Sequence, residues 1–333
     1  MPERRGPSSE GGQPVSASRR VDVSFVIPSY NGREVLERAL RDLIAAAPEA
    51  EIIVVDGGSQ DGSPELVAHS FPTVVLRKES NFGWGHASNR GIERSTRPIV
   101  ALMNSDVFVQ RPALEALVER LVAAPGVAVV APMLHLPSGR RQPLWGILSP
   151  ILYPPRARLA RGPVEVPQVS GAFFMVRRSV LEELGGIDEN HFFYNEEWDF
   201  CRRLRLAGHR IELLRQHQVT HVAGSSTPRK PEFLLEQLRG FLYYLQKHHA
   251  GPTAELARVS MLLQGRVLSR LDTRAAHRKI WRRLAEIAAH RRFLDSPFPL
   301  SGRGVPRFQA VTAGRSIEAD SLGVPAAQKV TSP

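Results

Sequence analysis

Residues 21–31, VDVSFVIPSYN, and residues 51–63, EIIVVDGGSQDGS, decide the fold. Each stretch begins as a short apolar, β-branched run, the pattern of a buried strand, and ends in polar and turn-forming residues. Between them, residues 32–46 carry apolar side chains at helical spacing. This order predicts two parallel strands joined by an amphipathic crossover helix.

The alternation continues to residue 131. It predicts helices over 64–69, 85–95 and 112–123 and strands over 73–76, 98–103 and 127–131. Such a series is typical of a Rossmann-like α/β fold with a mixed, mostly parallel sheet flanked by helices. Prolines recur through 132–167, so we expect a long irregular loop there, and its apolar residues favour a docked lid or acceptor wall. A strand at 168–176 and a helix at 196–207 follow.

The composition indicates a globular protein without secretory features. Of its 333 residues 42% are hydrophobic, enough for a sizeable core, and the single cysteine, Cys201, fits a reducing compartment. Residues 1–20 are charged and rich in Ser, Gly and Pro, which predicts a disordered leader and a cytoplasmic protein. No apolar run reaches the length of about 18 residues that a spanning helix needs, so we expect any membrane contact to be peripheral.

The C-terminal third is helical and basic. Residues 227–296 predict a helical extension, and 297–333 predict a disordered tail. The net charge of +11 suits nucleic acid, anionic lipid headgroups or phosphorylated substrates equally well. Because the sequence carries no zinc, helix-turn-helix or RNA-binding signature, we expect no nucleic-acid partner.

Tyr30 and Asp56 follow the first two predicted strands, and ligands of open α/β sheets bind at the carboxyl ends of strands. Asp56 offers an acceptor for the imide N–H of a pyrimidine, and Tyr30 offers a stacking face. Residues 56–63 also suit a turn that caps the next helix, and alone each segment fits that simpler interpretation better. Their occurrence one strand apart favours a nucleotide site.

Asn104, Ser105 and Asp106 follow the apolar strand that ends at residue 103. A carboxylate at a strand end suits a hard divalent cation, which in turn bridges the oxygens of a diphosphate. A polar turn explains the same residues. His221 lies in VTHVAGSS, residues 219–226, where a hydrogen-bonded core histidine is the simpler interpretation. Together with Asp106 it completes a mixed oxygen and nitrogen site for Mn²⁺ or Mg²⁺.

Three acids, Glu196, Glu197 and Asp199, lie in the segment FFYNEEWDFC, residues 192–201. At the start of a helix, the dipole favours their ionised forms. An ionised carboxylate beside a metal-diphosphate site is what a general base for a hydroxyl nucleophile requires. Ordinary helix-start preference explains the acids but not the aromatic residues crowded around them.

In this order the four segments resemble the family 2 inverting glycosyltransferases with the GT-A fold, particularly the bacterial rhamnosyltransferase-like branch. The similarity runs from about residue 23 to residue 221 and includes NFGWGHASNRGI, residues 81–92, and the stretch 169–208. YYLQKHHAG, residues 243–251, also looks like the family's C-terminal helix ending. On this resemblance 21–226 form the nucleotide-sugar and acceptor domain.

The resemblance also implies roles for individual residues. Those bordering the nucleotide and diphosphate are Pro28, Tyr30, Asp56, Asn89, Asn104 and Asp106. Asp106 and His221 hold a divalent cation, Mn²⁺ or Mg²⁺, and the acidic pair at 196–197 contains the base. The implied reaction moves a sugar, rhamnose by analogy with the rhamnosyltransferase-like branch, from a nucleotide-diphosphate donor to a hydroxyl of a glycan or polyprenyl-linked acceptor in cell-envelope polysaccharide synthesis. The basic C-terminal helices then suit the inner face of the membrane.

Two departures from the family pattern matter. Asn104 stands where the family has an acid, which removes a charged ligand, and the usual Glu-Asp pair is Glu196 and Glu197. One extra methylene misplaces a base by about 1 Å, and such an error costs roughly 10²-fold in rate. We assign Glu197 as the base, with Glu196 and Asp199 as alternatives. A non-catalytic relative that binds sugar nucleotides or glycans is the alternative function.

Overall fold

Parallel pairing of the first strands builds one half of the sheet. The strands β1 (Val23–Ser29), β2 (Glu51–Asp56), β3 (Val75–Lys78) and β4 (Ile99–Met103) lie in the order β3-β2-β1-β4. Alternate residues of β1 enter different cores, Phe25 and Ile27 on one face and Val26 on the other. The sheet is therefore covered on both faces, as the sequence predicts.

The other half of the sheet is mixed. Its strands are β5 (Val107–Phe108), β6 (Val127–His135), β7 (Val164–Glu165), β8 (Phe173–Arg177) and β9 (Arg210–His221). The order continues β4-β8-β6-β9-β5, with β7 beside β9, and only β6 and β9 pair in parallel. The mixed α/β fold is confirmed, but within the described strands the mostly parallel character is limited to the first half.

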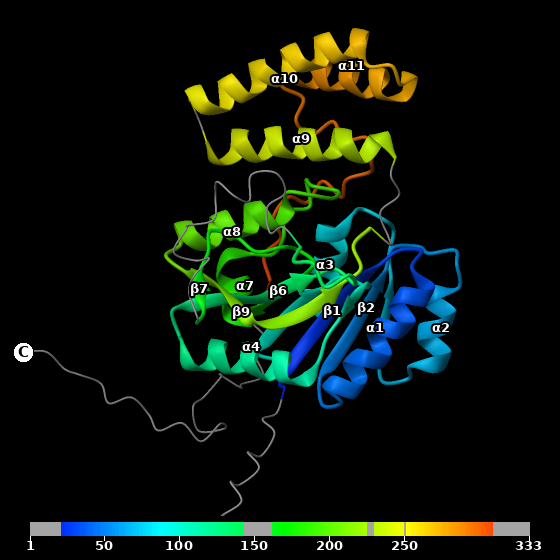
Figure 1. Ribbon diagram of the computed structural model, residues 1–333, viewed down its shortest axis with the longest axis vertical. Helices are drawn as coiled ribbons and strands as arrows, with labels where there is room; N and C mark the ends of the chain where they lie inside the picture. Colours follow the sequence, from blue (N-terminus) through cyan, green and yellow to red (C-terminus); the bar gives the residue numbers. More distant parts are fainter. Residues whose placement is uncertain (1–20, 143–161, 225–229, 250, 309–333) are drawn as a thin grey trace, which may run out of the picture.

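Helices cover both faces of this sheet (Figure 1). One face packs against α1 (Arg33–Ala46), α2 (Ser63–Ser70) and α4 (Arg111–Ala123). The other packs against α3 (Trp84–Arg94), α7 (Arg178–Leu184) and α8 (Glu196–Leu206). Glycine makes the closest of these contacts possible, since a Cβ at Gly91 of α3 would lie 2.2 Å from Cγ1 of Val26.

Several strands differ from the sequence prediction: β5 and β7 were not predicted, β8 begins at Phe173, and β6 and β9 are longer than expected. β6 continues through Pro132, where we expected irregular chain, because its pairing with β9 shifts register between Pro132 and Met133. Where the register shifts, the ladder of hydrogen bonds between the strands is already interrupted, so the missing N–H of proline removes no regular hydrogen bond. The length of β9 was missed because its middle, Arg215–Val219, is mostly polar.

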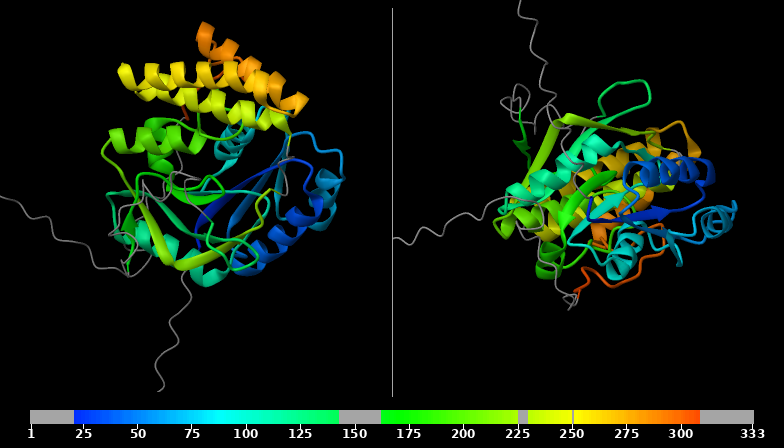
Figure 2. Two further views of the ribbon diagram at one scale, coloured as in Figure 1. Left: turned by 45° about the horizontal axis from the view of Figure 1, so that its top comes forward. Right: turned by 90° about the horizontal axis from the view of Figure 1, so that it is seen from below.

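Three helices form a separate layer on the sheet domain (Figures 1 and 2). They are α9 (Pro231–His248), α10 (Pro252–Leu271) and α11 (Ala275–His290). Apolar side chains from α9 and α11 make a third core, and α9 lies between the sheet domain and the α10–α11 pair. The predicted helical extension is present, while its limits as a domain remain a prediction. In the described chain, no helix combines the length and apolar character needed to cross a membrane.

The structure describes residues 21–142, 162–224, 230–249 and 251–308. The prediction of a disordered tail from residue 297 is wrong for 297–308, which return to the sheet domain. Phe298 stacks on Phe192 with ring centroids 4.4 Å apart, and the Gly186 N–H donates to the Pro306 carbonyl at 3.0 Å. The predicted leader, the rest of the tail and most of the predicted lid lie outside the described residues.

Candidate active site

A cavity of about 720 Å³ lies at the carboxyl ends of β1, β2 and β4, where the sequence places the ligand. The residues that line it come from these strand ends, from the start of α8, from the end of β9, from the start of α9 and from the C-terminal tail. Of the predicted site residues, the cavity is lined by Pro28, Tyr30, Asn104, Asp106, Glu196, Glu197 and His221. Most of the predicted site residues therefore line one and the same cavity.

Asp106 and His221 come together through the short strand β5. Val107 pairs with His221 in the antiparallel β5–β9 ladder, and the Val222 N–H donates to the Asp106 carbonyl at 3.0 Å. As a result Nε2 of His221 lies 3.2 Å from Oδ1 of Asp106. Both side chains are almost completely buried.

This pair fits a divalent cation. Two ligands at about 2.1 Å from a cation in octahedral geometry lie roughly 3.0 Å apart, close to the observed separation. The Gln142 side-chain oxygen lies 2.7 Å from Nδ1 of His221, so the ring proton belongs on Nδ1 and Nε2 is left as the ligand atom. Asn104 does not join them, because its side-chain oxygen accepts from the Trp84 indole N–H at 2.9 Å. The described residues offer no cluster of three or more His, Cys, Asp or Glu for a metal.

Of the two residues predicted to contact the nucleotide base, the structure places Tyr30 at the cavity and buries Asp56. Tyr30 is 41% exposed at the cavity, which leaves a ring face for stacking. Asp56 is buried at the end of β2 and does not itself line the cavity. Its Oδ1 accepts from the Gly58 and Ser59 N–H groups, while Oδ2 has no hydrogen bond within the described chain. Its contact with a base N–H stays a prediction.

Asn89 does not border the cavity. It is completely buried in α3, where its amide donates to the Ile187 carbonyl and to Glu189, and its oxygen accepts from the Ile187 N–H. Asn89 therefore ties α3 to the segment before the acidic pair. Its side chain does not line the cavity, and its implied contact with the nucleotide stays a prediction.

Glu196 and Glu197 line the cavity from the first turn of α8. Burial, and then the charge of Glu197, raise the pKa of Glu196 well above its usual range. Burial raises the pKa of Glu197 to about 7. For these two acids our expectation that the helix dipole would favour the ionised form is therefore wrong, because desolvation outweighs it. A carboxyl group poised near neutral pH is suited to take a proton.

Asp199 is excluded as the base by its contacts. Burial pushes its pKa upward, but the hydrogen bond from His248 and the charges of Arg203 and Lys247 outweigh burial, so the pKa lies well below its usual range. His248 Nε2 and Lys247 Nζ lie 2.7 and 2.6 Å from Oδ1, and Arg203 Nε lies 2.8 Å from Oδ2. Asp199 does not line the cavity, so its role is structural.

Helix α9 holds the segment that leads into the acidic pair. Lys247 bridges Asp188 and Asp199 at 2.6 Å each, and Glu236 accepts from the Phe192 N–H at 2.9 Å. This restraint matters because Tyr194 and Asn195 have positive φ angles of 72° and 69°, a conformation that costs energy outside glycine.

Gly240 lets α9 approach this turn closely. A Cβ at position 240 would lie 2.9 Å from Nδ2 of Asn195 and 3.1 Å from Nδ1 of His191. The side chain of Asn195 also donates to the Gln237 carbonyl of α9 at 3.0 Å. The C-terminal helices therefore fix the strained turn that aims the acidic pair into the cavity.

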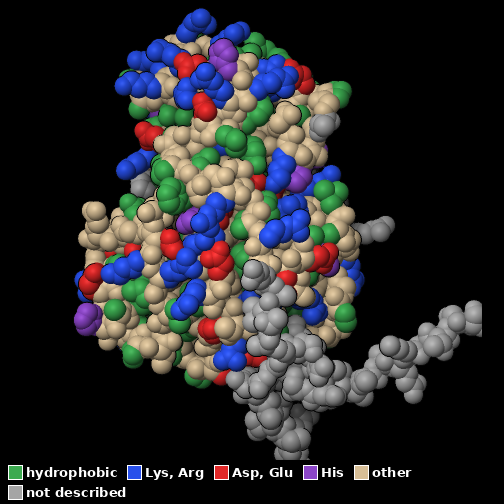
Figure 3. All heavy atoms as spheres, turned by 180° about the vertical axis from the view of Figure 1, so that it is seen from behind, with side chains coloured by type: hydrophobic (Ala, Val, Ile, Leu, Met, Phe, Trp, Pro, Cys, Tyr) green, Lys and Arg blue, Asp and Glu red, His purple; other side chains and the backbone are tan. Residues whose placement is uncertain are grey.

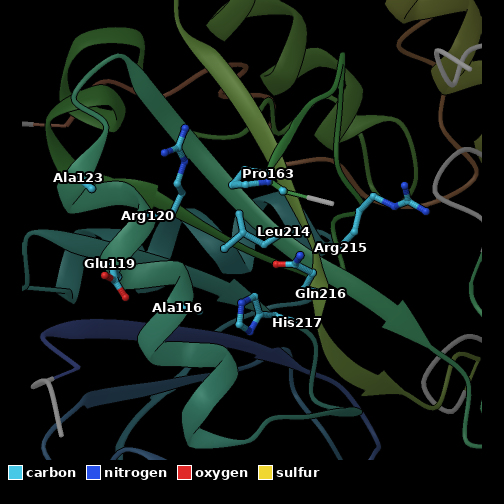
Figure 4. Close-up of a pocket in the computed structure, with 10 residues that line it drawn as sticks. Ala116, Glu119, Arg120, Ala123, Pro163, Leu214, Arg215, Gln216 and His217 are labelled. Atoms are coloured by element: carbon cyan, nitrogen blue, oxygen red, sulfur yellow. The ribbon is translucent and has the colours of Figure 1, made fainter. Parts of the chain in front are cut away.

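A second, smaller cavity of about 290 Å³ lies between α4 and β9 (Figure 4). Its side chains do not converge on a common point: Arg120 and Arg215 extend in different directions, and Glu119 points away from both. Arg120 is already paired with Glu212 at 2.6 Å. We assign no catalytic role to this cavity.

The sequence analysis missed several residues that line the site. They are Trp84, Gln142, Lys230, Phe233 and Phe298. Trp84 had a signal, since it lies in the family-like stretch 81–92. Phe298 had none, because it lies in the predicted disordered tail.

Comparisons with known proteins agree with this geometry. Residues 24–185 match the family model of glycosyl transferase family 2. Over 291 residues the chain is 28% identical to N-acetylglucosaminyl-diphospho-decaprenol L-rhamnosyltransferase of Mycobacterium tuberculosis, covering 76% of this chain and 95% of that protein. Over 213 residues it is 30% identical to pre-mycofactocin glycosyltransferase of the same species, covering 60% and 42%.

A solved structure shows the same fold. Mannosyltransferase PcManGT from Pyrobaculum calidifontis, in complex with GDP-Man and Mn²⁺, matches with a TM-score of 0.54 at 17% identity, covering 85% of this chain and 89% of that one. At this identity the likeness concerns the fold alone.

Replacing Lys247 with methionine tests the restraint by α9. The change leaves Asp188 and Asp199 with less compensating charge, so we expect a loss of about 3 kcal/mol in unfolding free energy at pH 7, the low end for a broken buried pair. Because the pKa of Asp199 is depressed in the folded state, its stabilisation is present above the unfolded pKa and is lost as pH falls through the folded pKa. The loss should be complete at pH 5 and above, and in urea unfolding it should shrink progressively as the pH is lowered from about 5 towards 2.

Lys279→Met, at an exposed position on α11, is the matched control and should change stability by less than about 0.5 kcal/mol. A loss from Lys247→Met that is equal at all pH values would contradict the ionic role.

Proposed function

Because the chain belongs to glycosyl transferase family 2, a family of sugar-transferring enzymes, we propose that it moves rhamnose from a nucleotide-diphosphate donor to a hydroxyl of a lipid-linked glycan, with inversion at the anomeric carbon. The observation that carries this proposal is the convergence of the Asp106–His221 pair and the Glu196–Glu197 pair on one cavity. The first pair suits a diphosphate with its cation, and the second suits a hydroxyl nucleophile.

The reaction is a single displacement. Glu197 accepts the proton of the acceptor hydroxyl while its oxygen forms a bond to the anomeric carbon of the donor. The bond from that carbon to the diphosphate oxygen breaks, and the nucleoside diphosphate leaves with the electron pair. Attack from the face opposite the leaving group inverts the configuration. Burial and the charge of Glu197 raise the pKa of Glu196, so Glu196 holds its proton more readily than an exposed glutamate and limits the negative charge beside Glu197.

Asp106 and His221 would hold the divalent cation, Mn²⁺ or Mg²⁺. When bound, such a cation neutralises charge on the leaving diphosphate.

The relatives support a proposal for the donor and the acceptor. The rhamnosyltransferase of M. tuberculosis is named for an N-acetylglucosaminyl-diphospho-decaprenol acceptor and transfers L-rhamnose. We propose the same classes for this chain, with dTDP-rhamnose as donor and a polyprenyl-diphosphate glycan as acceptor, in cell-envelope polysaccharide synthesis at the cytoplasmic face of the membrane. The non-catalytic alternative is disfavoured, because both acids of the pair face the cavity with raised pKa values.

Replacing Glu197 with glutamine removes the base and keeps the size of the side chain. We expect transfer to fall by at least about 10²-fold, the contribution of a general base, with donor affinity unchanged. In the wild type, kcat should rise between pH 5.5 and 8, since a carboxyl with a pKa near 7 must lose its proton to act. Steady-state rates and donor titration measure both. A Glu197→Gln enzyme that retains more than a tenth of the rate would move the base elsewhere.

Asp106→Asn tests the cation site. We expect nucleoside diphosphates to raise the Tm of the wild type more with Mn²⁺ than with EDTA, because binding stabilises the folded state by mass action. The variant should lose the Mn²⁺-dependent part of this shift and keep the part seen in EDTA. An unchanged Mn²⁺-dependent shift would show that the cation binds without Asp106.

We further propose that the α10–α11 layer docks on anionic lipid. Figure 3 shows Lys and Arg side chains gathered over this end of the molecule. On α10, side chains at helical spacing stay exposed, Leu256 at 72%, Leu263 at 54%, Val267 at 50% and Leu271 at 70%. An apolar stripe flanked by cations is the pattern of a helix that lies in a membrane interface.

Sedimentation with vesicles tests this docking. We expect the wild type to bind phosphatidylglycerol-containing vesicles at least about tenfold more tightly than phosphatidylcholine vesicles, with the difference reduced by salt. Leu263→Ser combined with Val267→Ser should weaken binding, because it removes apolar area from the stripe. Equal binding to both vesicle types would contradict the proposal.

A further inference from the structure

Part of the cavity is lined by a continuous aromatic surface, which we call the aromatic wall: Phe193, Tyr194, Phe233 and Phe298. Ring centroids are 4.6 Å apart between Phe193 and Tyr194, 6.1 Å between Phe193 and Phe233, and 4.8 Å between Phe233 and Phe298. The wall joins three distant segments: the loop before α8, the start of α9 and the C-terminal tail.

The rings of the wall are only partly buried. Each of them keeps some surface accessible, whereas the neighbouring Phe192, against which Phe298 stacks, is nearly covered. Exposed aromatic surface is unfavourable in water, so a cluster that faces a cavity indicates an apolar ligand. Three of the four rings are phenylalanine and offer no hydrogen bond to hydroxyl groups. The wall therefore suits a hydrocarbon chain better than a sugar ring.

A cation lies beside this wall. Lys230 is exposed and lines the cavity, and its carbonyl accepts from the Phe233 N–H at 3.1 Å. Among the described lining residues it carries the only Lys or Arg side chain. An ammonium group on a flexible stem pairs readily with phosphate oxygens. An apolar wall with one cation at its edge is complementary to a prenyl diphosphate.

The wall is also continuous with the catalytic pair. Tyr194 is separated from Glu196 by one residue, and the tail that carries Phe298 is attached to the same region through Ser301, which donates to Glu189. All four rings lie outside residues 24–185, the part that matches the family model. The wall is thus built by the segments in which this chain extends beyond the matched part.

We propose that Phe193, Phe233 and Phe298, with Lys230, form the acceptor subsite, which binds the diphosphate and the first isoprene units of a lipid-linked acceptor. This rests on the proposed function, since the subsite is useful to the reaction only if Glu197 acts on the acceptor hydroxyl. It gives the tail, expected from sequence to be disordered, a direct part in selecting the acceptor.

Binding of a short soluble probe tests the subsite without requiring turnover. Geranyl diphosphate and inorganic diphosphate are titrated calorimetrically into the full chain, with Mn²⁺ and a saturating concentration of whichever of dTDP, UDP and GDP raises the Tm most. We expect geranyl diphosphate to bind at least about tenfold more tightly than inorganic diphosphate. Phe298→Ala and Phe233→Ala should each weaken its binding about tenfold, and Lys230→Met should weaken both probes.

Phe308→Ala is the matched control, because Phe308 lies in the same tail and packs on the sheet-domain core without lining the cavity. It should leave both affinities unchanged. The inference is overturned if geranyl diphosphate binds no better than inorganic diphosphate, if the nucleotide displaces it, or if folded Phe298→Ala and Phe233→Ala variants bind it as the wild type does. If no nucleoside diphosphate raises the Tm with Mn²⁺, it is the proposed function that fails. A titration with geranyl diphosphate in the absence of nucleotide then shows whether the aromatic wall still binds a prenyl diphosphate.

Discussion

The pairing of β5 with β9 is the constraint on which the site depends. β5 has two residues, yet its ladder is what sets His221 beside Asp106. The position of His221 is fixed in turn by the pairing of β9 with β6, where the register jumps from Pro132–Leu214 to Met133–Gln218. Since a slip of one residue turns every side chain of a strand to the other face, this bulge decides whether the imidazole reaches the cavity.

The environments of neighbouring acids divide their roles. On one turn of α8, Glu196 and Glu197 lie in the cavity with raised pKa values, while Asp199 points to Lys247, His248 and Arg203 and keeps its charge. In the proposed reaction, such a separation of pKa values within one cluster of carboxylates distinguishes a proton acceptor from a structural anion. Helix α9 contributes Lys247 and His248 to this difference, beside Arg203 of α8 itself, so the C-terminal layer helps to shape the candidate site.

The sequence predicted what depends on local pattern and failed where distant partners decide. The longer strands that begin before residue 131 were predicted because β-branched runs such as Ile99–Met103 are buried on both sides, whereas the two-residue β5 was not predicted. β9 was missed because its polar middle is stabilised by pairing and not by its own composition. The ionisation of the acidic pair was predicted wrongly since burial cannot be read from spacing. The prediction of disorder for residues 297–308 failed for the same reason, because Phe298 packs against Phe192 and Phe233 from distant parts of the chain.

The extra methylene at Glu197 has a structural answer. A Cβ placed on Gly171 would lie 3.7–3.9 Å from Cβ, Cγ and Cδ of Glu197, so any larger residue at position 171 would pack against this side chain. Glycine has no such atom and leaves the space beside Glu197 open. The longer acid is therefore accommodated next to a residue without a side chain, which removes one steric obstacle to the departure from the Glu-Asp pattern.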